Sequence, residues 1–134
     1  MIQKAFNNLR MYLAEAVPEL GKIITHWEDL LSSSKNRTVM LNDSETSTDI
    51  KLIFNVRFIT ATVEKNPDTV SQAQMAIMEK VRGAVYSNNN PEGIISMSLP
   101  SVEYYDPAPQ SPNIGITIFQ IQLTVDYIAS CNYS

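Results

Sequence analysis

The sequence contains few of the residues from which catalytic, metal-binding and phosphate-binding sites are built. Its 134 residues include one cysteine, one histidine and four glycines. A lone cysteine, Cys131, excludes an intramolecular disulfide and a cysteine-based zinc site. His26 has no Cys, Asp or Glu at ligand spacing, so we interpret it as a structural histidine. Four glycines at these spacings form neither GxGxxG nor a Walker loop. We therefore expect no catalytic residues, no metal and no cofactor.

Positive charge and long apolar runs are also scarce. Lys and Arg number 10 against 14 Asp and Glu, which gives a net charge of −4. A nucleic-acid surface needs clustered cations, so we expect no specific binding of nucleic acid. No window reaches the roughly 18 apolar residues of a membrane span, and the first 20 residues lack the pattern of a signal peptide. These features predict a protein made in the cytoplasm without a membrane partner.

The residues that are present predict one folded domain, because 44% are hydrophobic and 18% are charged. Apolar residues recur at helical spacing over about 2–17 and 68–86. Pro18 should end the first helix near Ala16, and Pro67 should open the second. On the second helix the residues expected to face the core are Val70, Ala73, Met75, Ile77, Met78, Val81, Ala84 and Val85, the methionines serving as core filler.

Alternating patterns predict strands over about 22–27, 37–41, 50–63, 94–105 and 114–128. In the last of these the apolar parity changes after Ile118, which predicts a β-bulge near Ile118–Phe119. Two strands of 14 residues would each span roughly 45 Å, against a diameter of about 36 Å for a compact domain of this length. They should therefore bend or project. The prediction is an α+β fold: a mostly antiparallel, curved β-sheet with two amphipathic helices packed on it.

One face of the strand over 50–63 is a candidate contact surface. Its even-numbered residues are uniformly apolar, whereas the opposite face mixes aliphatic and polar side chains and should be partly covered by a neighbouring element or another subunit. The polar stretch 42–49 is interpreted as an overlong hairpin loop, either a mobile tip or a contact arm. Adjacent tyrosines near 105 favour either core plus surface or an interface. The residues assigned to a subunit or partner interface are Asp43, Glu45, Ile53, Asn55, Arg57, Ile59, Tyr104 and Tyr105.

Four stretches together give the sequence a family resemblance. They are FNNLRMYLAEAVPEL (6–20), AQMAIMEKVRGAV (73–85), GIISMSLPSVEYYD (93–106) and FQIQLTVDY (119–127). In this order they resemble the tail terminator and tail-completion proteins of tailed phages, the small proteins that join head and tail. The resemblance covers about residues 2–128 and is one of pattern, with no invariant motif. The acidic stretch 42–49 departs from the family pattern, because its length does not align with that of the family.

The resemblance implies helices against a mostly antiparallel sheet and a homohexameric ring in the virion. Such a ring caps the tail tube, stops its growth and offers a surface to the head connector, with DNA passing through its lumen. It implies neither an enzymatic activity nor a cofactor. Two other readings stay open. The chain could be another neck adaptor, stopper or tube-like subunit, or a small-ligand-binding α+β domain with a pocket between sheet and helices.

Overall fold

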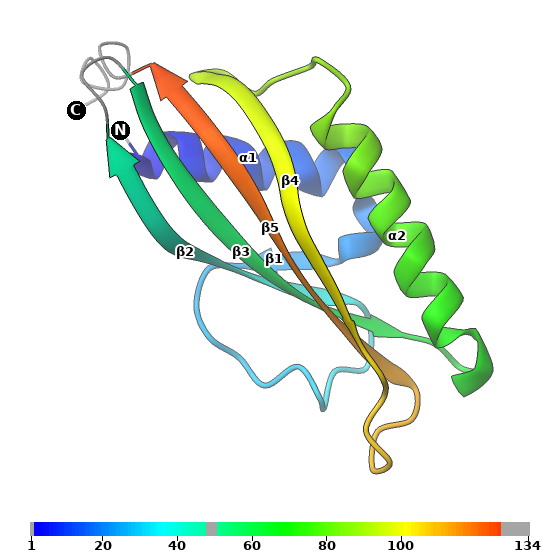
Figure 1. Ribbon diagram of the computed structural model, residues 1–134. Helices are drawn as coiled ribbons and strands as arrows, with labels where there is room; N and C mark the ends of the chain where they lie inside the picture. The colour runs from blue at the N-terminus through cyan, green and yellow to red at the C-terminus, as the bar shows by residue number, and fades with distance from the viewer. Residues whose placement is uncertain (1, 48–50, 127–134) are drawn as a thin grey trace.

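The fold is built on one five-stranded sheet, seen in a computed structural model that describes residues 2–47 and 51–126 (Figure 1). The strands are β1 (Lys22–Ile24), β2 (Arg37–Ser47), β3 (Lys51–Val63), β4 (Ile94–Tyr105) and β5 (Ile114–Asp126), in the order β1-β2-β3-β5-β4. β1 runs parallel to β2, and the other pairs are antiparallel. The long strands curve together (Figure 1). The predicted α+β class and mostly antiparallel sheet are confirmed.

Both helices pack on one face of this sheet. They are α1 (Ile2–Ala16) and α2 (Val70–Val85), each next to a short 3-10 turn, η1 (Pro18–Leu20) and η2 (Pro67–Thr69). α1 ends at Ala16 because a residue before proline avoids helical geometry. In Figure 1 α1 crosses behind the strands and α2 runs along their side. We call the face under the helices the inner face and the opposite one the outer face.

The inner face holds the main core. Phe54 and Phe58 of β3 and Phe119 of β5 are fully buried there, and the rings of Phe58 and Phe119 stack with centroids 4.8 Å apart. Leu9 and Leu13 of α1 complete the layer from the other side. Each buried side chain of this size contributes roughly 1.5–3 kcal/mol. The alternation within β3 therefore predicted its inner face correctly.

The end of α2 nearest Pro67 lies very close to β5. Gln74 is buried and donates its Nε2 to the carbonyl oxygen of Ile116, at 3.1 Å, and to Oγ1 of Thr117, at 3.0 Å. Gly115 allows this approach, since a Cβ there would lie 2.5 Å from the Gln74 side chain. Met78 is buried as predicted, but Met75 is 53% exposed, so the core assignment of Met75 was wrong. On α2 the position that faces β5 at this level is therefore the polar Gln74, and Met75 lies outside the buried face of the helix.

Two strand boundaries differ from the prediction. β2 continues through Ser47, so residues 42–47 belong to a strand and not to a loop. Backbone pairing with β3 holds this polar segment in place, although its side chains carry no strand pattern. β1 ends at Ile24, three residues earlier than expected. Residues 48–50 and 127–134, which include Cys131, lie outside the described residues.

The predicted bulge in β5 was wrong. β5 pairs with β3 without interruption from Lys51↔Asp126 to Val63↔Ile114. The apolar parity changes because both faces are covered where β5 begins. There the outer face carries Ile114 and Ile116 in a second group of packed apolar residues, and the inner face carries Gly115 and Thr117 against Gln74 of α2. Irregular register is found instead in β2 at Asn42/Ser44, beyond its pairing with β1, and in the edge strand β4 between Ile94 and Ser96 and between Ser98 and Ser101, where Pro100 stands.

Candidate subunit interface

The outer face carries half of the predicted contact residues in one row along β3. Ile53, Asn55 and Ile59 are each partly buried there, and Arg57 is exposed. Their neighbours in register across β5 are Thr124, Gln122, Gln120 and Ile118. Period-two geometry puts all of these side chains on the same side of the sheet. The structure thus brings the β3 residues together on a broad surface that no helix covers.

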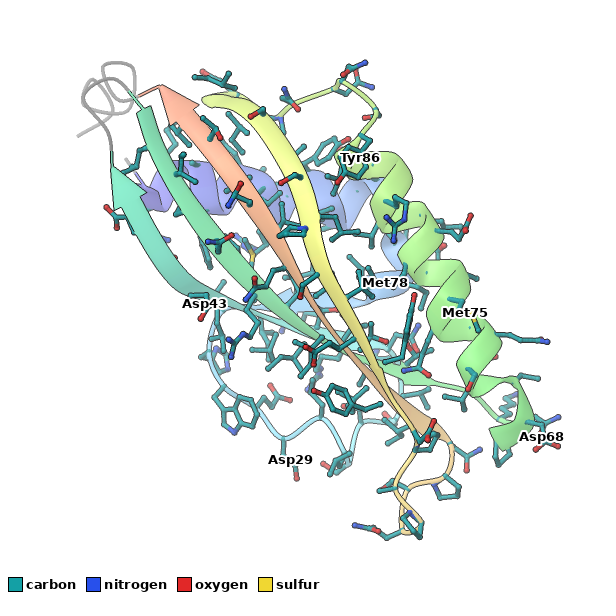
Figure 2. The ribbon with its side chains drawn as sticks, viewed as in Figure 1. Asp29, Asp43, Asp68, Met75, Met78 and Tyr86 are labelled. Carbon is teal, nitrogen blue, oxygen red and sulfur yellow. The ribbon has the colours of Figure 1, made fainter. Side chains whose placement is uncertain are left out.

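A hydrogen-bonded charge cluster lies at the centre of this surface. The register shift at Asn42/Ser44 inserts Asp43 as an extra residue of β2, and Figure 2 shows it beside β3. One carboxylate oxygen of Asp43 lies 3.3 Å from a guanidinium nitrogen of Arg57, and Nε2 of Gln120 donates to Asp43 at 2.7 Å. Three strands are therefore joined by one carboxylate. An exposed ion pair of this kind contributes at most about 1 kcal/mol, so it orients side chains more than it stabilises the fold.

Uncharged polar residues surround this cluster. Gln122 and Thr124 continue the row on β5, and Ser98 and Ser101 stand opposite the β5 glutamines on β4. Each can both donate and accept hydrogen bonds. Gln120 was not identified from the sequence, because the alternation of 119–126 marked only which residues face inward. Its role depends on Asp43, which comes from a different strand.

A strap, residues 25–36, covers the other part of the outer face. It connects β1 to β2 and has no helix or strand of its own. Leu30 is buried in it and packs with Val39, Ala61 and Ile114 in a second, smaller core. Partial cover of the outer face was predicted, and at this end a neighbouring element of the same chain supplies it. The second core explains the apolar outer-face residues near the start of β5.

The strap is held at several points. Asn36 donates its amide to the carbonyl oxygen of Glu19 at 2.8 Å and accepts the backbone N–H of Val63 at 2.8 Å. Arg37 forms an ion pair with Glu28. Ser111 in the β4–β5 connection donates to the carbonyl oxygen of Leu31 at 3.2 Å. The strap is therefore a positioned element whose outward side continues the outer face.

The strap displays His26 and Trp27 to solvent. Trp27 is 69% exposed, and His26 is exposed beside it. The structural role predicted for His26 in an apolar setting was therefore wrong. Among residues 2–47 and 51–126, no three or more His, Cys, Asp or Glu side chains are placed to hold a metal ion.

Three of the assigned residues belong neither to the row on β3 nor to the charge cluster with Asp43. Glu45 stands opposite Phe54, which puts it on the inner side of the sheet at the β2 edge, where it is exposed. Tyr104 and Tyr105 point to opposite faces of β4 and are both about half exposed, 48% and 46%. Neither tyrosine is a core residue, which corrects the alternative of core plus surface. Tyr105 donates to Glu103 at 2.6 Å, and this carboxylate raises the pKa of the Tyr105 phenol.

A hollow of about 830 Å³ opens where the strap meets the β3–α2 connection. Asn36, Val63 and Thr69 form its walls, and Lys35 and Lys65 are exposed at its rim. The Thr69 hydroxyl lies 2.8 Å from the carbonyl oxygen of Asn66 and 3.2 Å from the carboxylate of Glu64, and it can donate its one proton to either acceptor. Asn113 donates to the backbone carbonyls of both Glu64 and Lys65. The walls are thus fixed by hydrogen bonds, while the lysine side chains are exposed to solvent.

Comparison of the sequence with models of known protein families gives no match, and a search of curated proteins gives none either. Within the described ranges, no helix combines the length and apolarity required to cross a membrane.

Proposed function

We propose that this chain is a structural subunit of the phage neck, a tail terminator that assembles into a homohexameric ring. The ring would cap the tail tube and join it to the head connector. The observation that carries the proposal is the open part of the outer face, where the aliphatic residues Ile53 and Ile118 stand among Asn55 and Arg57 without a covering element. Ile59 borders this surface and packs against the second core. Half-buried aliphatic side chains beside satisfied polar ones are typical of a surface that a second protein covers. The family resemblance supplies the identity of the assembly.

Assembly through a face, and not through sheet edges, is supported by the edge strand β4 and by the part of β2 beyond Val39, which β1 does not pair with. Pro100 lies in the irregular part of β4 and lacks a backbone N–H to offer a new strand. β2 is irregular at Asp43 and carries exposed Glu45 near its end. Prolines, bulges and charges are devices that prevent strand addition. The proposal therefore places subunit contacts on the outer face and the strap, and not on the edges of the sheet.

The charge of the chain is compatible with a channel for DNA. Six copies at −4 each would carry −24. A lumen with this sign of charge repels phosphates and lets a duplex move without sticking. DNA would therefore pass through the lumen of the ring without being bound specifically.

A ligand-binding domain of this architecture would need a pocket between the sheet and the helices. That space is filled by side chains with no exposed surface, among them Phe58, Phe119 and Leu13. No observation here favours this second reading over assembly. Another neck adaptor or a tube-like subunit would use the same outer face. It would differ from a tail terminator in the size of the assembly that it forms.

Negative-stain microscopy and mass photometry of the purified protein test the proposal. We expect closed rings of one size near six times the subunit mass, and we expect them to stop tube growth when added to a polymerising tail tube protein. Monomers at every concentration would contradict the ring, and open filaments would indicate a tube-like subunit. Rings that leave tube growth unchanged would contradict the terminator role.

A further inference from the structure

We propose that neighbouring subunits join by inserting Trp27 of one copy into the lysine-rimmed hollow of the next. This inference rests on the proposed function for its partner, a second copy of the chain. It goes further by assigning a knob, a hole and a direction to the contact. The hole is the hollow lined by residues 34–36, 63–66 and 69.

Trp27 is suited to be a knob because it is both exposed and positioned. At 69% it is the most exposed large apolar side chain among the described residues. The residues that follow it are fixed: Glu28 pairs with Arg37, Asp29 Oδ1 accepts the backbone N–H of Leu31 at 3.0 Å, and Leu30 is buried. A tryptophan on a pinned loop loses little conformational freedom on binding. Tryptophan is also the residue most enriched at the energetic centres of interfaces.

The hollow has the chemistry to receive an indole ring. Val63 and the aliphatic stems of Lys35 and Lys65 offer apolar contact, and the two ammonium groups can lie against the ring face. No ion-pair partner is found for either lysine among residues 2–47 and 51–126, whereas Arg37, Arg57 and Lys80 are each paired. These two cations are therefore available to an incoming group.

Charge around the knob complements charge around the hole. Asp29 is exposed two residues after Trp27, and Figure 2 shows it on the strap pointing away from the sheet. Docking would bring this carboxylate toward Lys35 and Lys65. Glu64 is the one acidic residue of the hollow, against the two lysines. The rim is left with a net positive charge, in a chain whose overall charge is negative.

The placement of knob and hole allows a ring. Trp27 does not line the hollow of its own subunit. If the contact is made head to tail, with one knob and one hole engaged at each junction, it closes into a ring when its rotation allows. If two copies inserted their knobs into each other's holes, the product would instead be a closed dimer, so a dimer as the final product would contradict the ring. The same contact also brings the outer face, which the strap continues, against the neighbouring subunit.

Two complementary variants test this directly. Trp27→Ala keeps the hole and removes the knob, and it contains no tryptophan because the chain has only one. Lys35→Glu/Lys65→Glu keeps the knob and reverses the charge at the rim of the hole. We expect each alone to associate at least about thirtyfold more weakly than the unmodified protein, the effect of losing an interface centre. Mixed in equal amounts, they should form one-to-one complexes that grow no further.

Tryptophan fluorescence reports the docking step. In the mixture all tryptophan signal comes from the variant that keeps Trp27, so a blue shift upon adding the tryptophan-free variant measures burial of that side chain. The controls are Met11→Ala, an exposed apolar residue on α1 (62%), and Lys22→Glu/Arg82→Glu, exposed cations outside the hollow. Both controls should associate as the unmodified protein does. Circular dichroism melts verify that every variant is folded.

The outcomes separate this inference from the proposed function. If the unmodified protein forms rings and both variants form them equally well, the knob-in-hole contact is wrong and the ring proposal stands. If the variants form rings but no longer join tail tubes, Trp27 binds another protein, and the inference is overturned. If the unmodified protein never associates and the mixture shows no spectral shift, both proposals fail.

Discussion

At the scale of single residues, small and polar side chains decide how closely the layers of this protein approach. Gly115 lets α2 lie against β5, and the amide of Gln74 uses that closeness to bond Thr117. Thr38 and Thr60 share a buried hydrogen bond of 3.0 Å on the inner face. A buried hydroxyl or amide without a partner costs about 1–3 kcal/mol, so these contacts have to form together. None of them follows from hydrophobic periodicity, because each depends on two segments distant in the sequence.

Gly115→Ala should destabilise the protein by about 1–3 kcal/mol. Its Cβ would lie 2.6 Å from a methyl carbon of Val70, a stiff β-branched side chain, so either the helix or the strand must shift. The free energy of unfolding from urea titration measures this change. Gly83→Ala in α2 is the matched control, since nothing lies within 4 Å of its added carbon. The control should gain up to about 1 kcal/mol. Equal stability for both variants would show that α2 is not packed this closely.

At the scale of elements, the sequence predicts whatever is set by a regular pattern of burial. The alternation in β3 predicted its inner face, and Pro18 predicted the end of α1. β5 was misread because both of its faces are covered where it begins. The strap adds cover on the outer face at Ile114, while Gly115 and Thr117 interrupt the apolar pattern on the inner face under α2. Residues 42–47 were misread because their strand geometry comes from pairing with β3 and not from their own propensity.

Ile77→Ala should cost roughly 2–4 kcal/mol of unfolding free energy. Ile77 is 5% exposed and belongs to the main core, so removing its side chain leaves a cavity between α2 and the sheet. Thermal or urea unfolding measures the loss. Met75→Ala, on the exposed side of the same helix, is the control and should change stability by less than about 0.5 kcal/mol. A loss for Ile77→Ala as small as that of the control would mean that the buried face of α2 is assigned incorrectly.

At the scale of the whole molecule, the inner face of the sheet is covered by other parts of the chain, and the outer face is only partly covered. The inner face is closed by α1 and α2 (Figure 1), whereas the outer face is closed by the strap at one end and open around Asp43 and Arg57 at the other. Sequence reasoning placed Ile53, Asn55 and Arg57 on the open side through simple alternation. It did not find Trp27 or the hollow, because both depend on the path of an irregular loop.

Arg57→Glu should weaken assembly and preserve the fold. The new carboxylate would face Asp43 and repel it, which breaks the cluster that orders the centre of the outer face. Because exposed ion pairs contribute little, the melting temperature should change by only a few degrees. Mass photometry should show a shift from ring to monomer. Arg82→Glu, an exposed position on α2 with the same change in charge, should leave the assembly intact. An unchanged ring with Arg57→Glu would remove this part of the outer face from the interface.

The pairing of β3 with β5 also governs when the chain can fold. These central strands are neighbours in the sheet but are separated in the sequence by α2 and β4, so that Lys51 pairs with Asp126. Contacts this distant must wait for a long loop to close, which slows folding. During synthesis β3 has no central partner until residues 114–126 have left the ribosome. Until then the edge of β3 that pairs with β5 is open to wrong partners, and the pairing of β5 ends this exposure.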